Sequence, residues 1–326
     1  HRALSEHKTL SVSWSHYPRS TELLCLRDLV AKGVSLNGLL PILEPINVNT
    51  RNLLTCLNVW NSDIIVILNP YQEDFSSHNN VLTLNQNLSS VLTNKNNIIS
   101  GYLIQPNTTI NDINNWLNAN LNRRVALLYD NPSLSNSDIQ LLATNQLISY
   151  HVVLNNKMLP NQCALLPLSK LIIISDNFRK LAKNADYNGP ELFTHAHQFV
   201  GQNYLGFGDY TITGQVLDLG GGQPSAVAAH LVFKNLQANT VWIRHFVSSN
   251  TQRGSSNVTA KFLDVSDQIT NLVPQHPTQF GSNIGLNYYY YNSQPTVRHF
   301  PGLPKNKQYQ ITHHICFMLD LIAGRI

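Results

Sequence analysis

Carboxylate side chains recur at the ends of apolar runs in this chain of 326 residues. Glu44, Asp130 and Asp176 each end such a run, and Asp209 lies in a later one. Two carboxyl groups in a partly desolvated cleft have pKa values that are pushed apart, which suits acid–base catalysis, and carboxylates also bind Mg²⁺. These four residues form the predicted catalytic set, and Mg²⁺ is the cofactor that such a set would take.

The same residue types have a structural interpretation. Asn, Asp and Glu next to proline also form turns and cap helices. Asn69 and Asn131 each stand directly before a proline, and turn formation is favoured for both. Glu44 and Asp176 are the better functional candidates, because each ends an otherwise continuous apolar strand.

Four further residues are predicted to bind a ligand: Gln105, Arg179, Tyr187 and His245. Arg179 is expected to neutralise one of two aspartates, Asp176 and Asp209, that approach each other from adjacent strands. A loop containing Tyr187 is expected to overhang the site. The alternative is that these loop aspartates only cap turns and that Arg179 is solvated.

Four of the histidines raise separate questions. His230 and His245 lie in two apolar β patterns and are expected to face each other across a hairpin, where buried structural histidines are the favoured interpretation. The pair in His195-Ala-His197 has a metal-like spacing, but it follows the seventh predicted strand within a predicted helix. Metal binding is therefore disfavoured there.

The elements that must position these residues follow a regular pattern. Proline cannot donate to a sheet ladder, so the prolines after 44, 69, 105 and 131 end strands. Helical patterns separate most of the strands, which is typical of a βα repeat, and functional sites of such folds lie at the carboxyl ends of the strands. The predicted fold is an eight-stranded βα barrel resembling a TIM barrel, with strands at 10–14, 39–44, 63–69, 98–105, 125–130, 151–155, 171–176 and 207–213.

Further elements are predicted after the eighth strand. Two apolar runs, 226–233 and 241–247, predict a β-hairpin, and 258–273 and 309–322 predict helices. No Gly/Ser-rich or Pro-rich linker divides the chain. We therefore predict one barrel-like domain, 1–326, in which 214–326 is an elaborated C-terminal portion.

Composition limits the class of protein. The formal net charge is +4 and only 12% of residues are charged. The basic residues Arg179, Lys180 and Lys183 make a weaker footprint than a dedicated nucleic-acid-binding protein has. The four cysteines show no CxxC spacing, which favours free thiols in a reducing compartment, and no run reaches the 18 or so apolar residues of a membrane span. A cytoplasmic protein without membrane contact is predicted.

Several segments together resemble a known family. They are Glu22–Asp28, Leu40–Pro45, Ile65–Pro70, Ser175–Phe178, Asn184–Tyr187, Gly206–Tyr210, Ala226–His230 and His245–Ser248. Over roughly residues 10 to 250 the chain resembles a family of uncharacterised bacterial proteins similar to the phage "beta protein" group. The resemblance implies a barrel-like α/β fold, genes near a restriction-endonuclease-like partner, and a role in mobile-element or anti-phage biology. It implies no catalytic residue.

Two functions follow as expectations. The first is an accessory protein of a defence or mobile-element system that recognises nucleic acid, a nucleotide or a nuclease-like partner protein at the barrel mouth. The family resemblance and the basic patch Arg179, Lys180 and Lys183 favour it, as does the absence of a P-loop, GxSxG, GxGxxG or HExxH motif. The alternative is a metal-assisted phosphodiester hydrolase that uses the four carboxylates.

Overall fold

The computed structural model describes residues 20–216, 222–253 and 257–326. These residues form two compact units, the first made of 20–176 and 196–210 and the second of 177–195 and 211–326. Each unit has its own sheet. Whether the whole chain acts as one domain stays a prediction.

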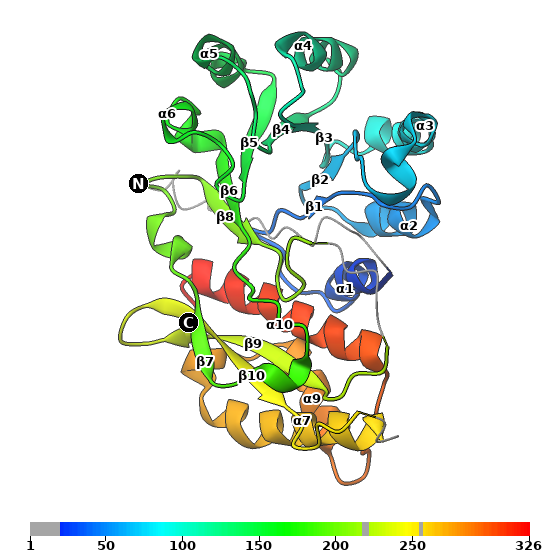
Figure 1. The fold of residues 1–326 in the computed structure, drawn as a ribbon, viewed down its shortest axis with the longest axis vertical. Coiled ribbons are helices and arrows are strands. Elements are labelled where there is room, and N and C mark those ends of the chain that lie inside the picture. The colour runs from blue at the N-terminus through cyan, green and yellow to red at the C-terminus, as the bar shows by residue number, and fades with distance from the viewer. Residues whose placement is uncertain (1–19, 217–221, 254–256) are drawn as a thin grey trace. The chain divides into compact units, whose positions relative to one another are not determined.

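The first unit is a curled parallel sheet with helices along its outer face (Figure 1). The strand order is β1-β2-β3-β4-β5-β6-β8, and each neighbouring pair is parallel. The strands are β1 (Ile42–Leu43), β2 (Ile64–Ile67), β3 (Ile98–Ile104), β4 (Val125–Tyr129), β5 (Ile148–Leu154), β6 (Leu171–Ser175) and β8 (Gly206–Asp209). The helices are α1 (Ser20–Ala31), α2 (Arg51–Val59), α3 (His78–Asn94), α4 (Ile110–Ala119), α5 (Asn136–Thr144) and the short α6 (Pro160–Cys163).

Two apolar layers hold this unit together. The outer layer joins alternate strand residues such as Leu127 and Val153 to Ile113 of α4 and Ile139 of α5. The inner layer contains the other alternate residues, among them Leu128 and Ile174, together with Tyr210. Burial on both faces explains why the sequence shows continuous apolar runs, as parallel strands covered by helices do.

The closed eight-stranded barrel predicted from the sequence is not observed. Seven strands match predicted ones, from the run at 39–44 to the run at 207–213. The predicted strand at 10–14 lies outside the described residues, and within the described ranges β1 and β8 do not pair with each other. Proline at positions 41 and 45 limits β1 to two residues, so this edge of the sheet offers little ladder for closure.

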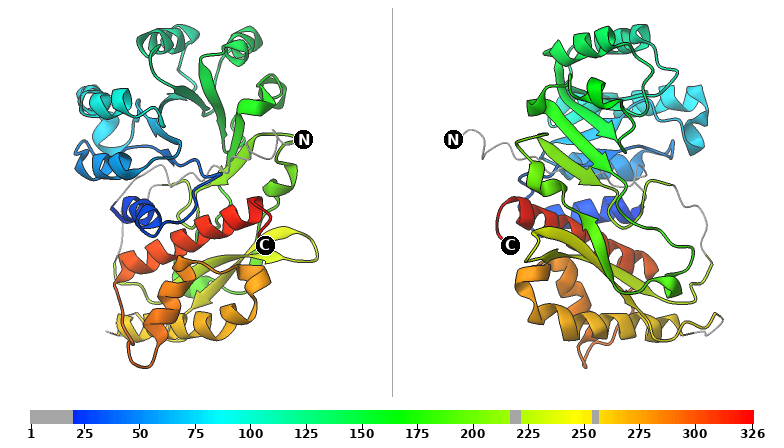
Figure 2. Two further views of the ribbon diagram at one scale, coloured as in Figure 1. Left: turned by 180° about the vertical axis from the view of Figure 1, so that it is seen from behind. Right: turned by 60° about the vertical axis from the view of Figure 1, so that its left-hand side comes forward.

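The second unit is built on a three-stranded antiparallel sheet, order β7-β10-β9 (Figure 2). Its strands are β7 (Pro190–Thr194), β9 (Ala228–Asn235) and β10 (Thr240–Val247), and its longer helices are α7 (Val258–Leu272), α9 (Ile284–Ser293) and α10 (Leu303–Ile322). The predicted hairpin and both predicted helices are confirmed. Strand β7 was missed, because the sequence around it is rich in glycine, asparagine and aromatic residues and shows no alternation.

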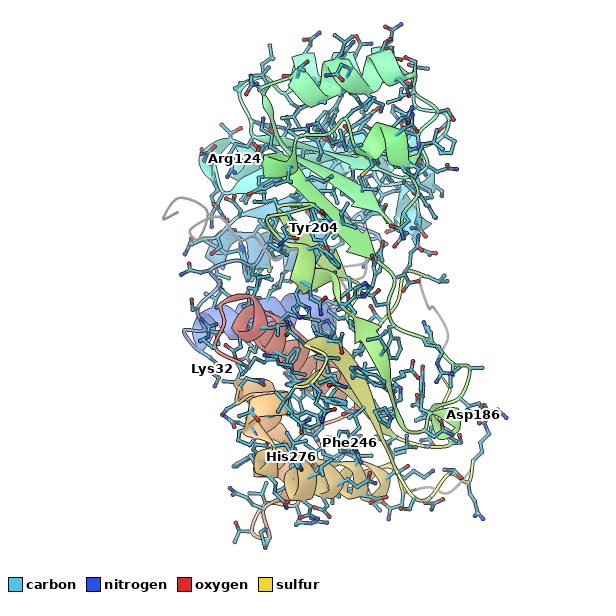
Figure 3. All side chains as sticks on the ribbon, turned by 90° about the vertical axis from the view of Figure 1, so that its left-hand side faces the viewer. Lys32, Arg124, Asp186, Tyr204, Phe246 and His276 are labelled. Carbon is cyan, nitrogen blue, oxygen red and sulfur yellow. The ribbon has the colours of Figure 1, made fainter. Side chains whose placement is uncertain are left out.

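The helices of the second unit pack on one face of this sheet. Phe246 of β10, labelled in Figure 3, belongs to the same apolar cluster as Phe262 and Ile269 of α7. Helix α10 runs beside β9, and the side chain of Asn306 donates to the carbonyl oxygen of Ala228 at 3.0 Å. The edge of β9 is therefore covered by a helix rather than left exposed.

Candidate functional site

The predicted site residues follow the carboxyl ends of the parallel strands. Because side chains alternate between faces, a residue two positions after an inner-layer residue also faces inward. Ile42, Leu128 and Ile174 belong to the inner layer. Glu44, Asp130 and Asp176 therefore continue the inner face beyond β1, β4 and β6, and we call this part of the first unit the carboxyl edge.

Glu44 is a buried and strongly perturbed group at the carboxyl edge. Only 2% of its surface is exposed, and its Oε2 accepts a hydrogen bond of 3.1 Å from Nε2 of Gln72. Burial is the main cause that raises the pKa of Glu44 to about 8. The hydrogen bond from Gln72 lowers this pKa, and the charge of Asp130 raises it. Glu44 is thus mostly a neutral carboxylic acid at pH 7, able to donate a hydrogen bond as well as to accept one.

Asp130 lies near Glu44 and has a cationic partner. Its Oδ1 is 3.6 Å from Nζ of Lys157, an exposed side chain on the loop after β5. Tyr71, on the loop after β2, is near both acids: burial raises the pKa of its phenol first, and the charges of Glu44 and Asp130 raise it further. The three groups are close enough to interact electrostatically.

Tyr210 lies among these acids and was missed by the sequence analysis. It is fully buried, and its hydroxyl accepts a hydrogen bond of 2.8 Å from Nδ2 of Asn155. Burial raises its pKa well above the ordinary value, with further contributions in the same direction from the charges of Asp176, Asp130 and Glu44. The only signal in the sequence was its place at the end of the run from Gly206.

The structure separates Asp209 from the other three carboxyl residues. Strands β6 and β8 are neighbours as predicted, with Asp209 opposite Ser175 and Phe207 opposite Ile173. Ile173 packs in the outer layer, so the alternation directs Asp209 to the outer face and Tyr210 to the inner one. The expected approach of Asp176 and Asp209 on one face is therefore wrong, since the register places the two on opposite faces.

Two amides at the same edge differ in role. Asn69 donates through Nδ2 to the carbonyl oxygen of Leu103 at 3.0 Å and accepts from its backbone N–H at 2.8 Å, so it extends the pairing of β2 with β3. This role is structural, but it is a bridge to the neighbouring strand rather than the turn formation favoured from the sequence. Gln105 is half-buried at the end of β3, and its part in ligand binding stays a prediction.

The predicted metal site has no ligand set in the described part of the chain. No group of three or more His, Cys, Asp or Glu residues there is arranged to hold a metal ion. This applies both to the four predicted carboxylates and to the His195–His197 pair. The helix expected around that pair is a 3₁₀ turn, Ala196–Phe199, directly after β7.

Three of the four predicted ligand-binding residues meet in the second unit. Arg179 does not neutralise Asp176 or Asp209: its guanidinium binds Glu191 of β7, with the shortest contact at 2.6 Å. The missed strand β7 explains the wrong expectation, because it places a carboxylate of the same unit beside Arg179. The hydroxyl of Tyr187 donates to the carbonyl oxygen of Arg179 at 3.0 Å and accepts from the backbone N–H of Leu181 at 2.8 Å.

The third of these residues, His245, faces His230 as expected. The two are directly opposite in the β9–β10 register, with their Nδ1 atoms 2.8 Å apart, and Nε2 of His245 is 3.4 Å from Oε2 of Glu191. Burial lowers the pKa of His230 to about 3, helped by His245, and burial also lowers the pKa of His245. Both imidazoles are neutral at pH 7.

Comparisons add no family to this description. No helix among the described residues is both long enough and apolar enough to cross a membrane. A scan against protein-family models finds no match, and a search of curated proteins finds none either.

Proposed function

We propose that the carboxyl edge of the first unit recognises a nucleobase, either of a free nucleotide or of a nucleic acid. The observation that carries this proposal is the buried Glu44, whose raised pKa keeps it a neutral acid at physiological pH. A neutral carboxyl group presents one donor and one acceptor, as the edges of nucleobases do.

The neighbours of Glu44 support a base rather than a phosphate group. The amide of Gln72 and the phenol of Tyr71 are uncharged groups that donate and accept hydrogen bonds. Lys157, a cation at this edge, is paired with Asp130, and the carboxyl group of Asp176 also interacts with nearby Tyr210. A phosphate group would be repelled by these acids. Binding sites of this kind orient a ligand with a few polar groups.

The biological setting is part of the proposal. The resemblance to the uncharacterised bacterial family supports a cytoplasmic accessory protein of a defence or mobile-element system, acting with a nuclease-like partner. The alternative, metal-assisted phosphodiester hydrolysis at the carboxylates, has no ligand set in the described residues to support it.

Calorimetric titration with the four nucleosides, their monophosphates and short single-stranded oligonucleotides at pH 6.5 and pH 9.5 tests the proposal. We expect one base to bind at pH 6.5 and to bind at least tenfold more weakly at pH 9.5, where Glu44 has lost its proton. Glu44→Gln keeps a donor and an acceptor and should bind equally at both pH values, whereas Glu44→Ala should lose tenfold or more.

The exposed Glu73 provides the matched control, since Glu73→Gln makes the same chemical change outside the hydrogen bond to Gln72. This variant should behave as the unaltered protein does. Equal binding by Glu44→Ala, or no binding of any base, would rule the proposed function out.

A further inference from the structure

The strands of the first unit begin at a second polar edge, opposite the carboxyl edge. A residue two positions before an inner-layer residue also faces inward, because side chains alternate between faces. The inner-layer residues in question are Ala126, Val152 and Ile172. Arg124, Tyr150 and Lys170 therefore face inward where β4, β5 and β6 begin, and we call this part of the unit the amino edge. Arg124 marks this edge in Figure 3.

A cavity of about 370 Å³ lies at the amino edge. Arg124, Tyr150 and Lys170 all line it, and its charged lining consists of the arginine and the lysine. The uncharged polar residues of the lining are Gln146, Ser149 and Ser169. Such a volume is typical of a site for a small molecule. The amino edge therefore combines a ligand-sized space with cationic and hydroxyl groups.

Ser149 reaches the cavity through an irregularity in β5. Val125 of β4 is opposite Ile148, and the next residue, Ala126, is opposite Tyr150, so Ser149 has no opposite residue on β4. This extra residue is a β-bulge, a feature that is rare between parallel strands and that redirects side chains. The bulge lets Tyr150 face inward while the neighbouring Ser149 still lines the cavity.

Arg124 is held in place with one side of its guanidinium unused. Its Nη1 and Nη2 donate to Oδ1 and Oδ2 of Asp63 at 2.7 and 2.9 Å, and the hydroxyl of Tyr150 donates to the same Oδ2 at 3.1 Å. The Nε–H and the second N–H of Nη2 form the other fork of the guanidinium, and neither donates to a residue that the structure describes. Because 31% of the side chain is exposed, this fork is accessible to a ligand.

Lys170 provides the excess positive charge of the cavity. Asp63 neutralises Arg124, whereas the ammonium group of Lys170 forms no hydrogen bond or ion pair within the described part of the chain. Burial first, and then the charge of Lys170, lowers the pKa of His151 to about 4, so this imidazole is neutral at pH 7. A positioned guanidinium fork beside a lysine favours an anion with several oxygens.

The hydrogen-bond donors of the cavity suit a phosphate group better than a carboxylate. The fork of Arg124 presents two N–H groups, the ammonium of Lys170 presents three, and Ser149 and Ser169 each present a hydroxyl. A carboxylate has only two oxygens to accept from them, whereas a phosphate monoester has three terminal oxygens and close to two negative charges.

We propose that the amino edge binds a small molecule through its phosphate monoester group. The Nε/Nη2 fork of Arg124 and the ammonium of Lys170 bind the phosphate oxygens, the serine hydroxyls donate to the same oxygens, and the rest of the cavity holds the organic part. None of these residues belongs to the carboxyl edge, so this site and the proposed nucleobase site are independent.

Calorimetric titration of the full chain with ribose 5-phosphate, inorganic phosphate and ribose tests the ligand class. Ribose 5-phosphate has no base for the carboxyl edge to recognise, so its binding reports on the amino edge. We expect it to bind, inorganic phosphate to bind more weakly because it leaves most of the cavity empty, and ribose not to bind. Equal affinities for the two phosphate compounds would overturn the assignment to a phosphate monoester.

Three variants test the residues. Lys170→Gln should weaken the binding of ribose 5-phosphate by about tenfold or more, and Arg124→Lys, which keeps the charge but loses the planar fork, should have a similar effect. Lys32→Gln removes an equal charge at an exposed position directly after α1, outside the cavity, and should bind as the unaltered protein does. Thermal melts check that each variant is folded. Unchanged affinity in folded Lys170→Gln, or no binding of either phosphate compound by the unaltered protein, would refute the site.

Discussion

At the scale of single residues, the raised pKa of the buried Glu44, on which the proposed function depends, also makes the stability of the protein depend on pH. Its pKa is about 8 in the folded protein against an ordinary value of 4.5, so the folded state holds a proton that the unfolded chain releases between these values. Stability is therefore greatest below pH 4.5 with respect to this group and falls as the pH rises towards 8. Each pH unit in that interval costs about 1.4 kcal/mol.

Glu44→Gln should remove this dependence. The variant stays neutral at every pH, so we expect it to exceed the unaltered protein in free energy of unfolding by roughly 5 kcal/mol at pH 8.5, and to match it near pH 4.5. Urea denaturation at the two pH values measures the difference. A variant that is equally or less stable at pH 8.5 would mean that Glu44 is ionised in the folded protein.

At the scale of elements, helices α9 and α10 pack closely only because Gly285 has no side chain. A Cβ atom there would lie 2.6 Å from the backbone nitrogen of His313 and 2.7 Å from the carbonyl oxygen of Tyr309. Backbone atoms of a buried helix cannot move away as a flexible side chain can. Gly285→Ala should therefore destabilise the protein by about 1–3 kcal/mol despite the better helix propensity of alanine.

Thermal denaturation checks this prediction, with Gly222→Ala as the control. A Cβ atom at Gly222 meets no atom within 4 Å, so that substitution should leave the melting temperature nearly unchanged. Equal melting temperatures for Gly285→Ala and the unaltered protein would show that the two helices can separate without cost.

At the scale of the whole molecule, the chain passes between the two units three times. Residues 177–195 leave the first unit after β6, contribute β7 to the second sheet and return to form β8. A fragment of residues 211–326 would lack β7 and would therefore leave one edge of β10 unpaired. Val241 and Ile243, two buried apolar residues of β10, would lose their partners on that edge. Unpaired edges promote association between chains.

We expect the fragment 211–326 to aggregate or to melt at a much lower temperature than the fragment 177–326, which keeps β7. Size-exclusion chromatography and circular dichroism of the two fragments make the comparison. A monomeric 211–326 fragment with an equally high melting temperature would show that β7 contributes nothing to the second sheet.

The sequence by itself determined the parallel strands and most of the carboxyl edge. Prolines and continuous apolar runs depend only on neighbouring residues, so Glu44, Asp130 and Asp176 were correctly located at strand ends. Only the tertiary structure shows that the sheet stays open, that Asp209 faces outward and that Arg179 pairs with Glu191. Register, closure and the partner of a charge depend on segments far apart in the chain. No local pattern around Tyr210 indicates that it will lie beside the acids at the other strand ends. Likewise, no local pattern around β7 indicates that it will pair with β10.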